Sequence, residues 1–335
     1  MSGPETHAEP VREAVRAYAA RQPQLVAATA GWVTLVRTLL DDAGIDYLSV
    51  TGRTKSVASF SAKANRTDGD RLLYPHPLEQ ITDQIGVRVI TYVHSDVAAV
   101  AEVLDDQLTI LDDRDLGEET ARSGRFGYAS RHLLVRSEDA DDNDEHPELA
   151  GERASIQVRT VLQHAWAEFE HDIRYKGNVP EDAAADLDRR FTLAAGLIEL
   201  ADREFATIRE RIQQAAPGST TEVEADHIVG QELATFLAGH YSDAGWSHTD
   251  HYDWIAGLLT QLGIDSIDDL DDLLTSVDAD AVIRRMGYRY PAGAVRRLDD
   301  ALLAIFGEQY VTLEGNSHRV PLLRARLEKL TTPES

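Results

Sequence analysis

The 335-residue chain contains no cysteine. This absence excludes disulfide bonds and metal sites built from thiolates. Long apolar runs are missing too, because Asp, Glu or Arg interrupts each of them well before the length of about 20 residues that a membrane-spanning helix needs. Residues 1–9 carry neither a basic stretch nor an apolar core, so the sequence shows no secretion signal. We therefore expect a cytoplasmic protein that does not insert into a membrane.

Positive charge is scarce: 33 Lys and Arg residues stand against 58 Asp and Glu residues, and the formal net charge is −25. Binding to duplex nucleic acid depends on a basic surface. The composition therefore argues against DNA as a partner and disfavours tRNA. A local basic patch stays open, and four arginines are candidates for it: Arg122, Arg125, Arg131 and Arg136.

Hydrophobic periodicity predicts an α+β domain over residues 1–216, built on a mixed β-sheet flanked by helices. Helical spacing runs from Pro10 to Ala43, and Pro23 is predicted to separate two helices there. Residues 85–93 (IGVRVITYV) alternate and are rich in β-branched side chains, which predicts a strand. Further strands are predicted at 47–51, 126–135 and 154–159, and further helices at 56–66, 96–108, 160–175 and 180–215.

Pro217, Gly218 and Ser219 mark a break in the chain. The segment after it, residues 222–335, is predicted to form a small all-α domain of unknown role. Its helices are predicted at 231–240, 252–262, 267–274, 279–286, 292–305 and 321–330. One weaker strand candidate runs from Tyr310 to Leu313.

Basic and hydroxyl side chains gather in residues 53–63 (RTKSVASFSAK), where a predicted strand turns into a helix. Arg53 and Lys55 alternate in the turn, while Ser59 and Lys63 lie four residues apart on one helical face. A helix N-terminus flanked by cations suits an anion, in particular a nucleoside triphosphate. An exposed basic turn with a serine N-cap would give the same pattern.

Asp83 stands immediately before the predicted strand at 85–93, and Arg88 lies within it. A carboxylate at the mouth of a strand is a candidate ligand for Mg²⁺, which usually takes one or two carboxylates together with phosphates. Arg88 would then neutralise phosphate charge or orient the carboxylate. The alternative is an ion pair between the two residues.

Two further segments carry polar residues at a spacing of two. Tyr128, Ser130 and His132 share one face of a predicted strand, and an aromatic ring beside glycine offers a platform for stacking a base. A tyrosine in the core is the alternative. Ser155, Gln157 and Arg159 share the polar face of the strand at 154–159. Because a polar face on a central strand is costly unless it is satisfied, this face is predicted to line a site.

In this order, and followed by the helical segment QHAWAEFEHDIRYK at residues 163–176, these motifs resemble the synthetase domain of the RelA/SpoT family over residues 30–210. Members of that family make the alarmones (p)ppGpp on a mixed sheet related to the nucleotidyltransferases. The resemblance implies transfer of pyrophosphate from ATP to the 3′-hydroxyl of GDP or GTP, with Mg²⁺ as cofactor.

The resemblance also assigns roles to residues. Those that match the ATP site are Arg53, Lys55, Ser59 and Lys63. Asp83 matches the magnesium ligand, and Arg88 completes that catalytic motif. Those that match the acceptor site are Tyr128, which would stack on the guanine, His132, Gln157 and Arg159.

One position departs from the family pattern. The family strand begins Glu-x-Gln-x-Arg-Thr, and its glutamate is thought to activate the 3′-hydroxyl and to help bind Mg²⁺, whereas this chain has Ser155 there. Serine cannot act as a general base near neutral pH, and general-base help is worth about 10²–10⁴-fold. Glu152 is a nearby carboxylate with the wrong strand parity, and Glu168 and Glu170 follow on the next helix.

Three functions therefore remain open at this point. The chain is an alarmone synthetase with a different base, a nucleotide-binding pseudo-enzyme with weak or no activity, or a relative that pyrophosphorylates the 3′ end of tRNA. The sequence leaves a homo-oligomer open as well.

Overall fold

The computed structural model describes residues 5–122, 130–137, 146–176, 184–215 and 227–332. The chain divides into two compact units. The first comprises residues 1–39, 47–97 and 107–202, and the second comprises residues 40–46, 98–106 and 203–335. The domain division predicted from the sequence, 1–216 and 222–335, stays a prediction.

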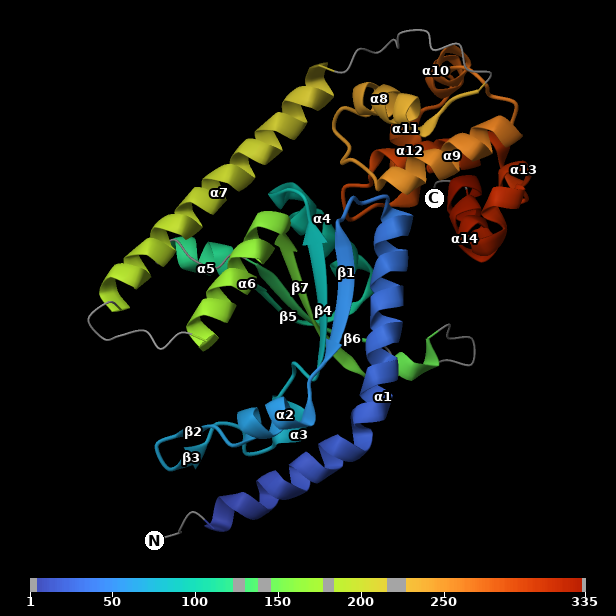
Figure 1. Cartoon of the computed structure of the whole chain (residues 1–335). Coiled ribbons are helices and arrows are strands. Elements are labelled where there is room, and N and C mark those ends of the chain that lie inside the picture. The colour runs from blue at the N-terminus through green and yellow to red at the C-terminus, as the bar shows by residue number, and fades with distance from the viewer. Residues whose placement is uncertain (1–4, 123–129, 138–145, 177–183, 216–226, 333–335) are drawn as a thin grey trace. The chain divides into compact units, whose positions relative to one another are not determined.

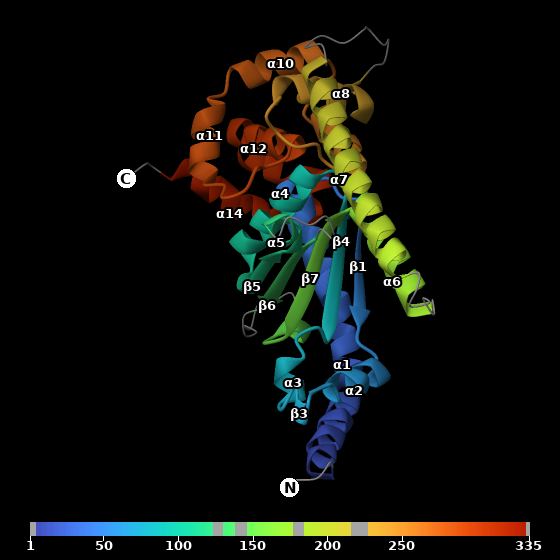
Figure 2. The same ribbon diagram turned by 90° about the vertical axis from the view of Figure 1, so that its left-hand side faces the viewer.

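A five-stranded sheet forms the centre of the first unit. Its strands are β1 (Ser49–Thr54), β4 (Ile85–Thr91), β5 (Thr109–Asp115), β6 (Arg131–Arg136) and β7 (Arg153–Thr160). They lie in the order β1-β4-β7-β6-β5 (Figure 2). The pair β4–β7 is parallel and the other three pairs are antiparallel, so the predicted mixed sheet is confirmed.

One face of the central strands is apolar and is covered by α1 (Glu5–Ala43). Val87, Val89, Ile156 and Val158 are all buried. In the same row as Val87 and Ile156, Gly52 lets the helix approach closely, because an added Cβ would lie 2.6 Å from a methyl group of Val33. This close packing fixes β1 against α1.

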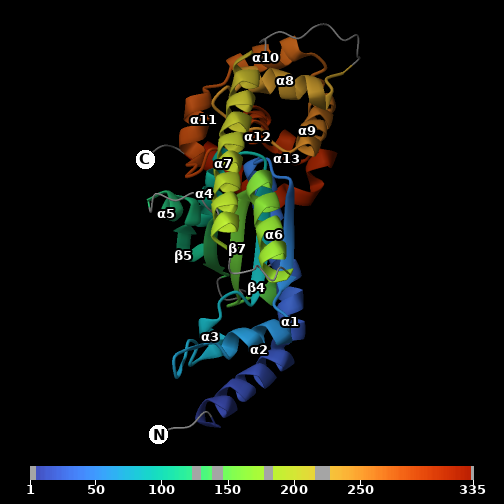
Figure 3. The same cartoon turned by 60° about the vertical axis from the view of Figure 1, so that its left-hand side comes forward.

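The opposite face of the sheet is covered by α6 (Val161–Lys176) and by α7 (Ala184–Ala215), as Figures 1 and 3 show. The other helices of the N-terminal part are α2 (Val57–Ala64), α3 (Pro77–Gln80), α4 (His94–Gln107), α5 (Leu116–Arg122) and the 3-10 turn η1 (Pro147–Leu149). A small hairpin of β2 (Thr67–Asp68) and β3 (Arg71–Leu72) follows α2.

The predicted helix break at Pro23 is wrong. α1 runs through both Pro10 and Pro23, and it bends along its length (Figure 1). Proline removes one backbone donor and kinks a helix, but packing can hold the helix together across it. Here Tyr18 and Leu25, on either side of Pro23, are almost completely buried, so tertiary packing outweighs the local preference.

A buried threonine at the end of β7 forms hydrogen bonds with residues of both α6 and α7. Thr160 Oγ1 lies 2.9 Å from each carboxylate oxygen of Asp202 on α7. The backbone N–H of Thr160 donates to the Gln163 side chain at 3.0 Å, and the Gln163 N–H donates back to Thr160 Oγ1 at 3.2 Å. These contacts hold the start of α6, and therefore its position over the polar face of the sheet.

Thr160→Val is expected to lower the free energy of unfolding by about 1–3 kcal/mol, because it leaves the buried Asp202 carboxyl without its hydroxyl partner. Urea denaturation followed by circular dichroism measures this cost. Thr192→Val is the matched control, since the exposed Thr192 hydroxyl bonds only to the backbone of its own helix. Equal costs in the two variants would contradict a joining role for Thr160.

The second unit is helical, as predicted for this part of the sequence. Its helices are α8 (Gly230–His240), α9 (Thr249–Gln261), α10 (Ile267–Thr275), α11 (Ala279–Met286), α12 (Ala294–Phe306), α13 (Glu308–Val311), η2 (Glu314–Arg319) and α14 (Val320–Thr331). Leucines of α8, α9 and α12 form much of its core. The strand candidate Tyr310–Leu313 is wrong, because its first two residues end α13. Within the described ranges, each helix is too short or too polar to cross a membrane.

Candidate active site

Strand β7 has one apolar face and one polar face, and the polar face carries three of the candidate site residues. Ile156 and Val158 are completely buried, while Ser155 and Gln157 on the other face are partly exposed. Arg159 shares the polar face and is buried, and its guanidinium donates to Gln157 Oε1 at 2.6 Å. The predicted alternation along this strand is confirmed.

Strand register extends this polar face across three strands. Gln157 stands opposite Arg88 on β4 and opposite His132 on β6. In the next row, Ser155 stands opposite Gly86. Directly opposed residues of neighbouring strands point to the same side of a sheet, so Arg88, Gln157 and His132 form one polar row, and Ser155 begins the next.

At the N-terminal end of β4, the Asp83 carboxylate is held between two lysines. Lys55 Nζ lies 2.9 Å from Oδ2 and Lys63 Nζ lies 3.0 Å from Oδ1. Burial raises the pKa of Asp83, but the hydrogen bonds from the two lysines outweigh burial and hold the pKa below its ordinary value. Asp83 is therefore ionised throughout the neutral range, and its carboxylate can bind a metal cation as well as the two lysines.

The basic turn is built by β1 and α2. The backbone N–H of Lys55 donates to the carbonyl of Gln84 at 2.8 Å, which places the lysine beside Asp83. Ser56 is the N-cap of α2, since its hydroxyl accepts from the N–H of Ser59 at 3.1 Å. Arg53 on β1 stands opposite Gly86 and is exposed. The serine cap and the cation cluster are thus present together, and the cap does not exclude an anion site.

The ion pair between Asp83 and Arg88 that the sequence left open is not formed. Asp83 pairs with the lysines, and Arg88 Nη1 lies 2.9 Å from Glu168 Oε1 on α6. No local sequence pattern indicates this second pair, because it depends on how α6 crosses the sheet. Lys55 and Lys63 therefore share the Asp83 carboxylate, and Arg88 pairs with Glu168.

His132 lies in the polar row with a neutral ring. Burial lowers the pKa of its imidazole, and the positive charges of Arg159 and Arg114 lower it further. A neutral imidazole can donate one hydrogen bond and accept another, and it adds no charge to the site. Tyr128, predicted to stack on a base, lies outside the described residues.

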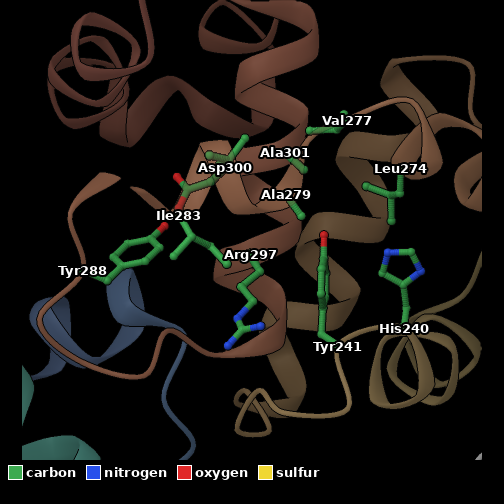
Figure 4. A pocket seen from close by; sticks show the side chains of 11 residues that line it. His240, Tyr241, Leu274, Val277, Ala279, Ile283, Tyr288, Arg297, Asp300 and Ala301 are labelled. Atoms are coloured by element: carbon green, nitrogen blue, oxygen red, sulfur yellow. The ribbon is translucent and has the colours of Figure 1, made fainter. Parts of the chain in front are cut away.

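A cavity in the helical unit, lined by side chains such as His240, Tyr241 and Arg297 (Figure 4), is a poor nucleotide site. Its volume is about 30 Å³, room for roughly two water molecules. Burial raises the pKa of Tyr241 to about 12, so the phenol stays neutral at physiological pH. The polar face of the sheet, with its cluster of cations, is therefore the better candidate.

The chain is similar in sequence to known proteins of one family. The family model described as "Region found in RelA / SpoT proteins" matches residues 52–179, which include Arg53, Asp83 and the whole of β7. GTP pyrophosphokinase YjbM of Bacillus subtilis (strain 168) is 33% identical over 193 residues, which are 54% of this chain and 81% of that protein. GTP pyrophosphokinase YwaC of the same organism is 29% identical over 162 residues, which are 48% of this chain and 72% of that protein.

Among solved structures, the small alarmone synthetase 1 from Bacillus subtilis bound to its product pppGpp is similar with a TM-score of 0.46 and 27% sequence identity. That match covers 59% of this chain and 99% of the synthetase. Given the matched family region and a relative covered over 81% of its length at 33% identity, this chain belongs to the RelA/SpoT family.

Proposed function

We propose that this chain is a pyrophosphokinase that transfers the terminal pyrophosphoryl group of ATP to the 3′-hydroxyl of GDP or GTP, giving (p)ppGpp. The observation that carries the proposal is the Lys55–Asp83–Lys63 cluster at the N-terminal end of β4, the strand that carries Arg88 of the polar row. Two relatives of the chain are named GTP pyrophosphokinases, which supports the same reaction. Because ATP and GTP are cytoplasmic nucleotides, we also infer a cytoplasmic location.

The basic turn would bind the donor. Lys55 stands immediately before the N-cap of α2 and Lys63 lies in its last turn, and both ammonium groups are largely buried. Together with Arg53 and Ser59 they would contact the phosphates of ATP. Lysine binds phosphate as a compact point charge, and a helix N-terminus adds free N–H groups. Arg88 lies further along β4, in the polar row, and would contact the transferred pyrophosphoryl group.

The polar row would bind the acceptor. Gln157 and His132 lie in it, and Arg159 lies two residues beyond Gln157 and donates to it. These three residues would contact the guanosine nucleotide, with Tyr128 as the proposed stacking partner of the base. Since phosphoryl transfer asks little covalent chemistry of the protein, positioning of the two nucleotides and neutralisation of charge would supply most of the rate enhancement.

The residues present fit one Mg²⁺ ion. Asp83 is ionised and half-exposed, and Mg²⁺ in nucleotide sites commonly takes one carboxylate and completes its shell with phosphates and water. When bound, the ion would neutralise phosphate charge as it develops. Ser155 offers no second charged ligand, so Asp83 would hold the ion alone among the residues of this face.

Lys55→Ala tests the proposal. The full chain is incubated with γ-labelled ATP, Mg²⁺ and GDP or GTP, and the nucleotides are separated by chromatography. The wild type is expected to give labelled (p)ppGpp together with unlabelled AMP. In Lys55→Ala, kcat/KM is expected to fall at least about 10²-fold because a charged phosphate contact is lost. Lys329→Ala, which changes an exposed lysine on α14, is the control and should retain full activity.

Ser155 supports a second candidate, a nucleotide-binding protein without turnover. In the same experiment this candidate predicts no labelled product but saturable ATP binding that Lys55→Ala weakens. Loss of both product and binding would contradict both candidates.

The tRNA alternative is disfavoured by the ion pairs of the arginines proposed for a basic patch. Arg122 pairs with Glu118 at 2.6 Å and Arg131 pairs with Asp113 at 2.7 Å. Paired arginines present little net positive charge to a nucleic acid. Arg125 lies outside the described residues.

A further inference from the structure

The polar face lacks a carboxylate at Ser155, the position where the resemblance implies a glutamate. A serine hydroxyl does not take up a proton near neutral pH, so another group must do so if the chain catalyses the transfer. The first carboxylates to consider are Glu152, three residues before Ser155, and Glu168 on the helix that follows β7. The structure separates the two by the face of the sheet on which each lies.

Glu152 is held on the wrong face. Its two carboxylate oxygens accept hydrogen bonds from Arg21 at 2.6 and 2.7 Å, and Arg21 belongs to α1. That helix covers the apolar face of the sheet, where Thr29 contacts Thr54 at 2.6 Å. A carboxylate fixed to α1 cannot reach an acceptor bound along the polar face.

Glu168 lies on the right face. Its Oε1 is 2.9 Å from Arg88 Nη1, and Arg88 stands opposite Gln157 in the polar row. Ser155 and Gly86 lie two residues before Gln157 and Arg88 along their strands, which corresponds to roughly 7 Å. A nucleotide ribose with its phosphates spans such a distance, and Gly86 has no side chain to fill the space beside Ser155.

The surroundings of Glu168 suit a proton acceptor. Its side chain is 55% exposed, so a substrate can approach it while Arg88 Nη1 lies 2.9 Å from Oε1. His164, one helical turn earlier, is 3.8 Å from the same oxygen. Burial lowers the pKa of His164, and Arg88 lowers it further, so this imidazole stays neutral and does not compete with Arg88 for the carboxylate.

From this geometry we infer that Glu168 accepts the proton of the acceptor 3′-hydroxyl, in place of the glutamate missing at Ser155. The inference rests on the proposed pyrophosphokinase function. As the proton moves to the Glu168 carboxylate, the 3′-oxygen forms a bond to the β-phosphorus of ATP. The bond from the β-phosphorus to the bridging oxygen of the α-phosphate breaks, and AMP leaves with that electron pair. Arg88 orients the carboxylate.

The test exchanges the carboxylate between the two positions. Glu168→Gln is expected to lower kcat at least about 10²-fold with little change in the KM for either nucleotide. Adding Ser155→Glu to Glu168→Gln is expected to restore kcat to within about tenfold of the wild type, which a purely structural role of Glu168 would not allow. Glu308→Gln is the control, because Glu308 is equally exposed (55%) and also pairs with an arginine, Arg324 at 2.7 Å.

Full activity of Glu168→Gln, or a loss that Ser155→Glu does not restore, would overturn the role of Glu168. The single variant Ser155→Glu is assayed as well. If the wild type is inactive and Ser155→Glu is active, the role of Glu168 is overturned and the site is a synthetase site without a base. If neither the wild type nor Ser155→Glu makes product, the proposed function itself is contradicted.

Discussion

Replacing Asp83 by asparagine is expected to lower kcat for (p)ppGpp synthesis on the order of 10³-fold, with less than about tenfold change in the KM for ATP. Asparagine has the same size and keeps one oxygen, so the loop before β4 is retained. What it removes is the negative charge between Lys55 and Lys63. That charge would both hold Mg²⁺ and keep the two ammonium groups in place.

The KM for ATP should change little because the lysines remain. Freed from Asp83, Lys55 and Lys63 can still contact phosphate, so ATP binding is retained while the rate of transfer falls. Steady-state rates over a range of ATP and Mg²⁺ concentrations separate these two effects. Asp186→Asn is the control, since it removes the carboxylate of an exposed pair with Arg190 at 2.7 Å in the same unit. Wild-type kcat in Asp83→Asn would rule out Asp83 as the magnesium ligand.

The polar face of β7 was predictable because strand geometry has a period of two. Once residues 154–159 are assigned to a strand, Ser155, Gln157 and Arg159 must share a face opposite Ile156 and Val158. The partners of that face were not predictable. The register that sets Arg88 opposite Gln157 joins residues 69 positions apart and is fixed by the packing of the whole sheet.

Edge strand β5 was missed because its sequence gives no strand signal. Four of its seven residues are charged (TILDDRD), and an exposed edge strand needs no apolar alternation. Its polar residues are instead used in cross-strand pairs, as between Asp113 and Arg131 at 2.7 Å. Charged edge strands of this kind also limit pairing with other chains.

The error at Tyr310 has a different cause. The segment YVTL is rich in β-formers, but Tyr310 is completely buried and its hydroxyl donates to Asp299 on α12. The Asn316 side chain also donates to the carbonyl of Tyr310 at 2.7 Å. Contacts with residues distant in sequence outweigh intrinsic strand preference, and these contacts belong to a charged network that no local pattern indicates.

That network is the site of the largest expected effect on stability. Three arginines and three aspartates of the helical unit meet in its interior: Asp42, Arg296, Asp299, Asp300, Arg319 and Arg326. Asp299 accepts from Arg319 Nη1 at 2.9 Å, from Arg326 Nη2 at 2.6 Å and from the Tyr310 hydroxyl. With all carboxylates ionised the network is neutral, so removing one charge leaves a buried positive charge without compensation.

Asp299→Asn is therefore expected to lower the free energy of unfolding by about 3–5 kcal/mol. Urea denaturation at pH 7.5 measures it, and Glu308→Gln, which breaks an exposed pair, should cost less than about 1 kcal/mol. Burial raises the pKa of Asp299, but Arg326 and Arg319 outweigh burial and hold the pKa well below its ordinary value. The contribution of this group is present above the ordinary carboxyl pKa and is lost only as the pH falls through the lowered value. Titration of Asp299 itself should therefore not change the deficit between pH 8 and pH 5.

Asp299 is a cleaner probe than its neighbour, because burial raises the pKa of Asp300 to about 6 even though Arg326 opposes the rise. A change at Asp300 would therefore mix loss of a partner with loss of a titrating group. A double-mutant cycle with Arg319→Met then tests whether the network acts as a unit. Once Asp299 is neutral, removing Arg319 also removes a buried charge that has lost its partner, so the double variant should be more stable than the sum of the two single losses predicts. Strict additivity would mean that Asp299 and Arg319 stabilise the helical unit independently, through packing rather than through their ion pair.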